Sequence, residues 1–230
     1  MKPAFAEKGL LAPRLALVAV AFDLALVGLR IWTYPQILKM PGARAFIVEP
    51  TLALIIFMTI CAAMILWPFS RITSATASST HWGLLGGVIL AIHLALEDFG
   101  RHIGEDTSVT LAFMLITFAG WGVAGWRHAR LDRRWRFSPL AGCWAGMVST
   151  LMIVSFGYIL MFLDVPSADY IAIWPEFKQS GWSDARAFGI CNSLDAGFSH
   201  LLAGIVIGIA AGGIGGAFAA SQNSKSSCVC

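Results

Sequence analysis

The sequence predicts an all-α integral membrane protein with about six transmembrane helices, short loops and one longer outer loop. Of the 230 residues, 57% are apolar and only 13% are charged, a composition too hydrophobic for a soluble domain. The apolar residues come in long runs, and a hydrocarbon core of about 30 Å needs about 20 helical residues per crossing. Six crossings use most of the chain, so we expect a single polytopic membrane domain over residues 1–220.

The apolar runs and the residues that flank them place each crossing. Pro13 suits the first turn of the first helix, and Ser138 with Pro139 suits the start of the fifth. The expected helices cover residues 11–32, 46–67, 82–100, 109–126, 139–163 and 194–220.

The connections are predicted from their composition. The Ser- and Thr-rich residues 70–80 are expected to form a linker, and residues 164–192 the longest loop, held at the interface by its aromatic side chains. Residues 221–230 are expected to form a disordered cytoplasmic tail.

Charge predicts the orientation. The segment Arg127–Phe137 carries five arginines and one aspartate, and the positive-inside rule makes such a loop cytoplasmic. This places both termini in the cytoplasm of a cell with the chain in its inner (plasma) membrane. The first outer loop is an exception, because it carries Lys39 and Arg44, which the positive-inside rule would place in the cytoplasm. The concentration of charge in one loop also argues against nucleic-acid binding.

Glycines at four-residue spacing predict close helix contacts. Gly83 and Gly87 lie on one face of the third helix. The sixth helix repeats the pattern over four glycines, as in a glycine zipper: Gly204, Gly208, Gly212 and Gly216. Small residues at this spacing let helix backbones approach closely in lipid. The partner could be the third helix, or a second membrane chain in a homo-oligomer or a complex with other subunits.

Most ionisable residues fall in the predicted outer half of the membrane. His93 and Glu97 share a helix face, as do Asp98 and His102. At about 1.5 Å per residue, His93 and His200 lie at similar depth. We therefore predict an outer polar pocket between the third and sixth helices, formed by Glu49, His93, Glu97, Asp98, His102, Asp195 and His200.

Asp23 lies near the middle of the first helix, and Arg30 lies two turns later on the same face. The two side chains could compensate each other. A carboxylate inside a membrane is costly, so Asp23 is a candidate functional residue. Protonation, or a bond to a neighbouring helix, is the structural alternative.

Four interpretations of these polar residues remain open. His93, Glu97, Asp195 and His200 offer the nitrogen and oxygen ligands of a transition metal. His93 and His200 could instead be the axial ligands of a haem b, without a C-x-x-C-H attachment motif. The same residues, continued by Asp23, could line a permeation path or proton relay. Finally, the polar groups could simply pair with one another in a membrane subunit or scaffold.

The sequence contains no catalytic residues that we can name, because no nucleophile has a base beside it and no phosphate-binding loop follows a strand. We therefore expect a non-enzymatic protein, either a membrane subunit or scaffold or a small ion or solute transport protein. A metal- or haem-binding protein with a redox or metal-handling role is the alternative.

Overall fold

The computed structural model describes residues 3–66, 70–99, 107–132, 135–163 and 167–226. Within these ranges the regular structure is entirely helical, which confirms the predicted all-α fold. Six of the helices are long and apolar enough to cross a membrane. They are α1 (Pro3–Thr33), α2 (Ala43–Leu66), α3 (Ser70–Phe99), α4 (Thr107–Asp132), α5 (Ser138–Phe162) and α8 (Ala185–Ser226). The protein is a multi-pass membrane protein.

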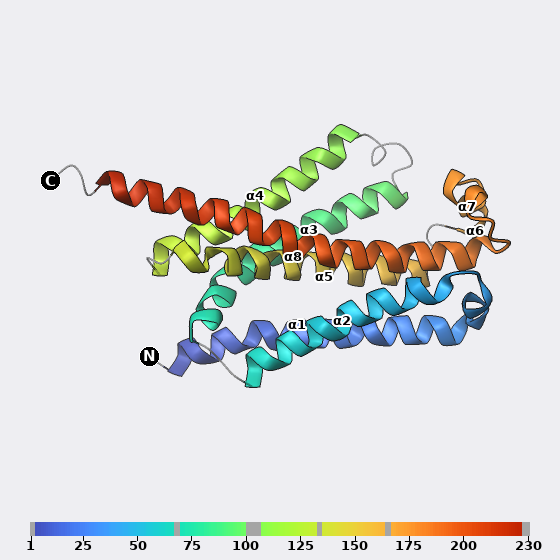
Figure 1. Ribbon diagram of the computed structural model, residues 1–230, viewed down its shortest axis with the longest axis horizontal. Coiled ribbons are helices and arrows are strands. Elements are labelled where there is room, and N and C mark those ends of the chain that lie inside the picture. Colours follow the sequence, from blue (N-terminus) through green and yellow to red (C-terminus); the bar gives the residue numbers. More distant parts are fainter. Residues whose placement is uncertain (1–2, 67–69, 100–106, 133–134, 164–166, 227–230) are drawn as a thin grey trace.

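The two chain termini lie at the same end of the bundle, called the terminal end below (Figure 1). The opposite end, called the far end, holds three short helices: η1 (Pro35–Lys39), α6 (Ala168–Ile171) and α7 (Pro175–Ser180). The remaining short helix, η2 (Trp135–Phe137), precedes α5 at the terminal end.

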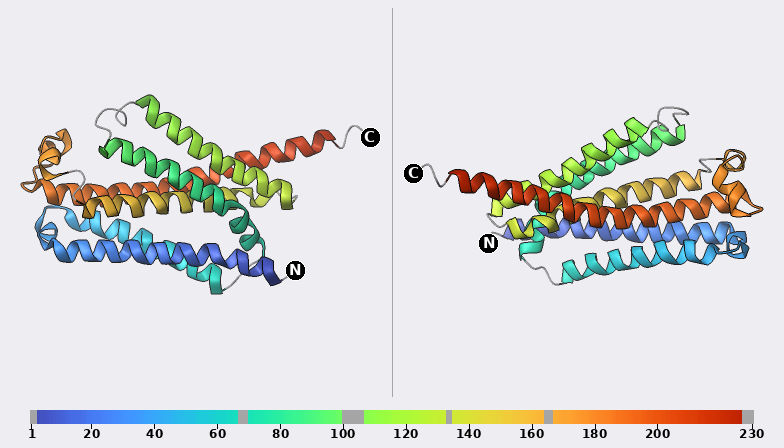
Figure 2. Two further views of the ribbon diagram at one scale, coloured as in Figure 1. Left: turned by 180° about the vertical axis from the view of Figure 1, so that it is seen from behind. Right: turned by 45° about the horizontal axis from the view of Figure 1, so that its top comes forward.

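Helix α5 forms the centre of the bundle. It packs against α1, α3, α4 and α8, and 67% of its apolar span is buried, against 28% or less for each of the other five spans. Helices α1 and α2 run side by side along one flank (Figures 1 and 2). Helices α3 and α4 pair with each other and diverge from α5 and α8 towards the far end (Figure 2).

Residues 70–80 are not the linker that their Ser and Thr content predicted, because α3 begins at Ser70. The hydroxyl groups of Ser78 and Ser79 donate to the Ala75 carbonyl, and that of Thr80 donates to the Thr76 carbonyl. Hydroxyl side chains that bond back to their own helix in this way are compatible with a helix interior.

Helix α8 is longer than the predicted sixth crossing at both ends. It begins nine residues earlier than residue 194, at Ala185, where the Asp184 carboxylate accepts a hydrogen bond of 3.0 Å from the Ala187 N–H and caps the first turn. The helix also continues to Ser226 through part of the segment predicted to be disordered. Residues 227–230 of that segment lie outside the described residues.

The four glycines of the predicted zipper on α8 contact α5, and not α3, which was the neighbour within this chain that the sequence suggested. A Cβ atom on Gly208 would lie 2.6 Å from the Gly142 carbonyl oxygen, and one on Gly212 would lie 2.6 Å from that of Ser138. Gly204 and Gly146 meet in the same way. Real Cβ atoms do not approach other atoms this closely, so the two backbones touch only because these positions are glycine.

The small face of α3 also packs on α5. Gly83 lies against Val148, and Gly87 lies against Met152. Beside Gly83, the Ser149 hydroxyl donates to the Gly83 carbonyl at 2.8 Å and accepts from the Trp121 indole N–H at 2.9 Å. This serine therefore joins α3, α4 and α5 through buried hydrogen bonds.

We expect Ser149→Ala to lower the free energy of unfolding by about 1–3 kcal/mol, because it leaves the buried Trp121 N–H without its acceptor. Thermal unfolding of the detergent-purified protein measures this change. Thr59→Val is the control, since the exposed Thr59 hydroxyl donates only to the carbonyl of Ile55 in its own helix. An equal effect in both variants would contradict the role assigned to Ser149.

Candidate functional site

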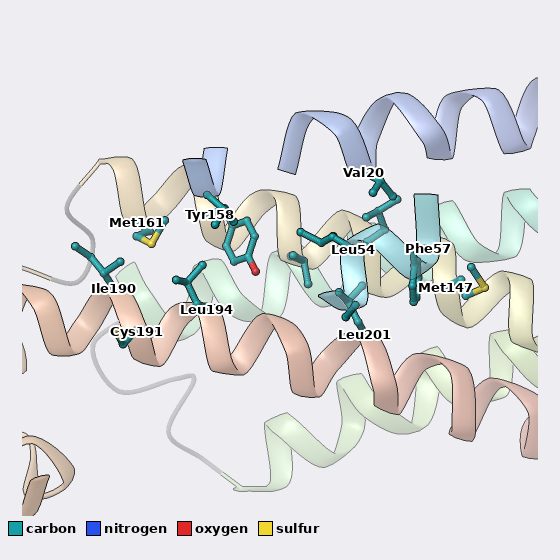
Figure 3. Packing of buried hydrophobic residues seen from close by; sticks show 14 of the residues in the cluster. Val20, Leu54, Phe57, Met147, Tyr158, Met161, Ile190, Cys191, Leu194 and Leu201 are labelled. Atoms are coloured by element: carbon teal, nitrogen blue, oxygen red, sulfur yellow. The ribbon is translucent and has the colours of Figure 1, made fainter. Parts of the chain in front are cut away.

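The largest apolar cluster of the protein lies between α1, α2, α5 and α8. Figure 3 shows Tyr158 of α5 in this cluster, with Leu194 and Leu201 of α8 and Leu54 of α2 nearby. The Tyr158 side chain is only 1% exposed. Among the described residues, its hydroxyl group has no hydrogen-bond partner. A polar hydroxyl is therefore buried among apolar side chains.

Asp23 of α1 enters the same region. It lies on the buried face of its helix, between Val20 and Val27, and is completely buried. Ten residues separate it from the end of α1 at Thr33, which places it about 15 Å inside that end. In the part of the chain that the structure describes, neither carboxylate oxygen of Asp23 has a hydrogen-bond partner. Such a group costs several kcal/mol to bury unless a proton or a cation compensates it.

Two α5 side chains lie beside this carboxyl group. Ser155 lies close enough to interact with the Asp23 carboxyl group, while its hydroxyl donates to the Leu151 carbonyl at 3.0 Å. Tyr158 is close enough for its hydroxyl to interact electrostatically with Asp23. A Cβ atom on Gly197 of α8 would lie 2.7 Å from the Tyr158 hydroxyl oxygen, so this glycine makes room for the phenol. We call Asp23, Ser155 and Tyr158 the core polar cluster.

The sequence had suggested that Arg30 could compensate the charge of Asp23, but the structure does not pair the two side chains. The Asp23 oxygens make no hydrogen bond to Arg30. The Arg30 guanidinium instead lies over the Phe162 ring, 5.4 Å from the ring centroid. Arg30 is 6% exposed and lines a cavity at the far end. The two residues share a face of α1 but belong to different surroundings.

His93 lies between α3 and α4. Its Nε2 atom is 3.1 Å from the Thr110 hydroxyl of α4 and 3.6 Å from a carboxylate oxygen of Glu97 in its own helix. The imidazole ring also contacts the Phe113 ring. His93 is buried, whereas Glu97 is exposed. The Thr110 hydroxyl and the Glu97 carboxylate thus give His93 Nε2 polar partners at the interface between α3 and α4.

The structure does not bring His200 to His93. Helices α4 and α5 separate α3 from α8, and α3 diverges from α8 towards the far end (Figures 1 and 2). The His200 side chain is exposed, and its Nδ1 atom is 2.6 Å from the Ala196 carbonyl of its own helix. The predicted facing of the two histidines failed because matching depth does not make two helices neighbours.

The remaining residues of the predicted outer pocket are also dispersed. Glu49 is exposed on α2, six residues after that helix begins, and Asp98 and Asp195 are half-buried on α3 and α8. His102 lies outside the described residues. Within the described ranges, no three His, Cys, Asp or Glu side chains lie together in a way that could hold a metal ion. The four predicted metal ligands, two of which were the predicted haem ligands, are therefore not assembled.

Sequence reasoning singled out Asp23 but missed its neighbours on α5. Ser155 and Tyr158 are three residues apart and thus share a helix face. Both interrupt an apolar segment, which is the signal that could have drawn attention to them. Their proximity to Asp23 depends on the packing of α1 against α5.

Comparison of the chain with protein-family models, with curated proteins and with solved structures finds no match. The fold and the core polar cluster are therefore interpreted from their own geometry, as those of a multi-pass, all-α membrane protein.

Proposed function

We propose that this protein is a small membrane transport protein that moves protons, with Asp23 as the group that takes up and releases the proton. The observation that carries this proposal is the complete burial of the Asp23 carboxyl group, with both oxygens lacking a hydrogen-bond partner among the described residues. Ionisable groups inside membrane spans are rare and commonly mark ion pathways and proton relays.

The chemistry of the core polar cluster favours a proton over a metal cation. Hard cations require several oxygen ligands at close range, whereas the cluster offers one carboxyl group and two hydroxyl groups. A proton needs only one acceptor. Ser155 and Tyr158 carry hydroxyl groups that can both donate and accept, as a relay to and from Asp23 requires.

We further propose that both termini face the cytoplasm of a cell whose inner membrane holds the protein. The arginines at the end of α4 lie at the terminal end of the bundle, together with the chain termini. The positive-inside rule then places this end in the cytoplasm. The far end, with α6 and α7, faces outward.

Proton flux in liposomes tests the proposed function. Purified protein is reconstituted into potassium-loaded vesicles that contain a pH-sensitive dye, and valinomycin imposes a negative potential inside. We expect the wild-type protein to acidify the interior faster than empty vesicles do. Asp23→Asn should reduce the rate to that of empty vesicles, because an amide cannot take up a proton at neutral pH.

Glu49→Gln is the matched control. It makes the same chemical change on α2, but at an exposed position away from the cluster, so flux should stay at the wild-type level. Equal flux in Asp23→Asn and wild type, or no flux in folded wild-type protein, would overturn the proposal.

A further inference from the structure

Helix α8 carries a polar face that stays uncovered within the described part of the chain. Asn192, Asp195, Ser199 and His200 share this face, where Asp195 is half-buried and the other three residues are exposed. The glycines that contact α5 lie on the opposite side of the helix. Helix α8 lies in front of α5 in Figure 1, with its outer side towards the viewer.

The two ionisable residues of this face lie at membrane depth. Gly204 meets Gly146 of α5, which precedes the far end of α5 at Phe162 by sixteen residues. Gly204 is therefore about 24 Å inside that end. His200 and Asp195 are four and nine residues closer to the far end, which places them about 18 Å and about 10 Å inside it. Both depths fall within a hydrocarbon core of about 30 Å.

Lipid offers these side chains no hydrogen-bond partner. The His200 Nδ1 atom is 2.6 Å from the Ala196 carbonyl oxygen. Because a carbonyl only accepts, Nδ1 donates, and Nε2 remains for a partner outside its own helix. Ionisable groups in membrane spans are costly, and they almost always pair with one another or face the interior of a bundle. The polar face of α8 thus indicates that a further transmembrane helix packs against it.

The spacing along this face describes the contact. Small and polar residues follow one another at alternating steps of four and three residues: Asn192, Ala196, Ser199, Ala203, Val206 and Ala210. All six are exposed or half-buried. Alternating steps of three and four residues are the a and d pattern of a left-handed coiled coil, and small residues at these positions let two membrane helices approach closely. We call these six residues the α8 seam.

The ionisable residues beside the α8 seam select a second copy of this chain as the partner. With Ser199 at a d position, Asp195 occupies the preceding g position and His200 the following e position. In a parallel coiled coil, g and e residues of opposite helices pair across the seam and set the choice of partner. Two copies inserted in the same orientation have parallel α8 helices. Asp195 of each copy then meets His200 of the other, and two-fold symmetry makes this contact twice.

We propose that the protein is a homodimer in the membrane, joined along the α8 seam, with Asp195 of each copy bonded to His200 of the other. A carboxyl group and an imidazole form this hydrogen bond with the shared proton on either group, so the pair carries no net charge. Asn192 and Ser199 both donate and accept, and each pairs with its counterpart in the second copy. This interface is separate from the core polar cluster and does not depend on proton transport.

Disulfide cross-linking in proteoliposomes tests the α8 seam. The five cysteines of the chain are replaced by alanine, and Ser199→Cys is introduced and oxidised with copper phenanthroline. We expect a dimer band, because equivalent residues of the seam face each other across the two-fold axis. Thr59→Cys is the matched control, since it also replaces a hydroxyl with a thiol at an exposed position, but on α2. It should give no dimer band.

Exchanging the two ionisable residues tests the pairing. Energy transfer between donor- and acceptor-labelled full-length copies is followed as added lipid dilutes them. Asp195→Ala and His200→Ala should each weaken dimerisation about tenfold, the effect of losing two hydrogen bonds between membrane helices. The double variant with Asp195→His and His200→Asp should restore it, because the exchange rebuilds both pairs.

Four outcomes would overturn the proposal. The first is wild-type protein that stays monomeric at every lipid ratio, and the second is dimer bands of equal strength in Ser199→Cys and Thr59→Cys. The third is wild-type association in both alanine variants, and the fourth is an exchange variant that associates no better than they do. The cross-linking result does not depend on the folding of the alanine variants, so the two tests stand independently.

Discussion

Gly208→Ala is expected to destabilise the protein, although it adds a single methyl group. The new Cβ atom would lie 2.6 Å from the Gly142 carbonyl oxygen and 3.2 Å from the Cys143 Cα atom. Both are backbone atoms, which cannot rotate away, so α5 and α8 would have to move apart. We expect the free energy of unfolding to fall by about 1–3 kcal/mol, the usual cost of overpacking a core. Thermal or denaturant unfolding in detergent measures the change.

Gly213→Ala provides the control on the same helix. A Cβ atom at this position meets nothing closer than the Pro139 side chain at 3.7 Å, an ordinary contact. Because alanine favours a helix over glycine by about 0.8–1.0 kcal/mol, we expect this variant to be as stable as wild type or slightly more stable. The two substitutions, five residues apart, should thus have opposite signs. A loss of stability in both would show that α8 tolerates no added methyl group, whatever the distance to α5.

Asp23→Val should stabilise the protein while abolishing proton flux. The substitution replaces an unpartnered carboxyl group with an apolar side chain between Val20 and Val27, both of which are buried. Removing an unsatisfied buried polar group is worth about 1–3 kcal/mol, and each kcal/mol corresponds to roughly 2–4 °C in a protein of this size. Melting curves and the liposome assay on one preparation measure both effects.

The combination of results identifies the role of Asp23. Higher stability with lost flux is typical of a functional group retained at the expense of stability. Lower stability would contradict our description of the site, because it would mean that the carboxyl group has a stabilising partner. Asp23→Asn separates the effect of the ionisable group from that of an unpartnered buried polar group, since it removes the first and keeps the second.

The number and type of the helices could be predicted from the sequence because length and apolarity suffice for a membrane crossing. Which helices are neighbours in the bundle could not be predicted. Lipid tails are as apolar as leucine, so the side chains that face lipid and those that face another helix look alike in the sequence. His93 and His200 were predicted to lie at similar depth, but they lie on helices separated by α4 and α5. Asp23 could be found because it is an ionisable residue inside an apolar run. Tyr158 could not, because its proximity to Asp23 depends on which helices are neighbours.

The predicted helix boundaries were wrong where polar side chains form hydrogen bonds to carbonyl groups of their own helix. The hydroxyl groups of Ser79 and Thr80 bond to carbonyls one turn earlier, so the residues that resembled a linker extend α3. The start of α8 had a readable signal, because Asp184 directly precedes Ala185 as a typical helix cap. Aromatic residues nearby had favoured an interfacial loop instead.

Helix α8 is longer than the hydrocarbon core of a membrane at any tilt. Its candidate membrane span of 38 residues measures about 57 Å, nearly twice the thickness of a hydrocarbon core of about 30 Å. Even at the upper limit of about 40° for transmembrane tilt, about 44 Å would remain along the membrane normal. Gly216 is level with the start of α5, and the turns beyond it run past the other helices (Figure 1). The C-terminal turns of α8, including Phe218 with 60% of its side chain exposed, must therefore emerge among the lipid head groups, where they limit how deeply the bundle can sink into the bilayer.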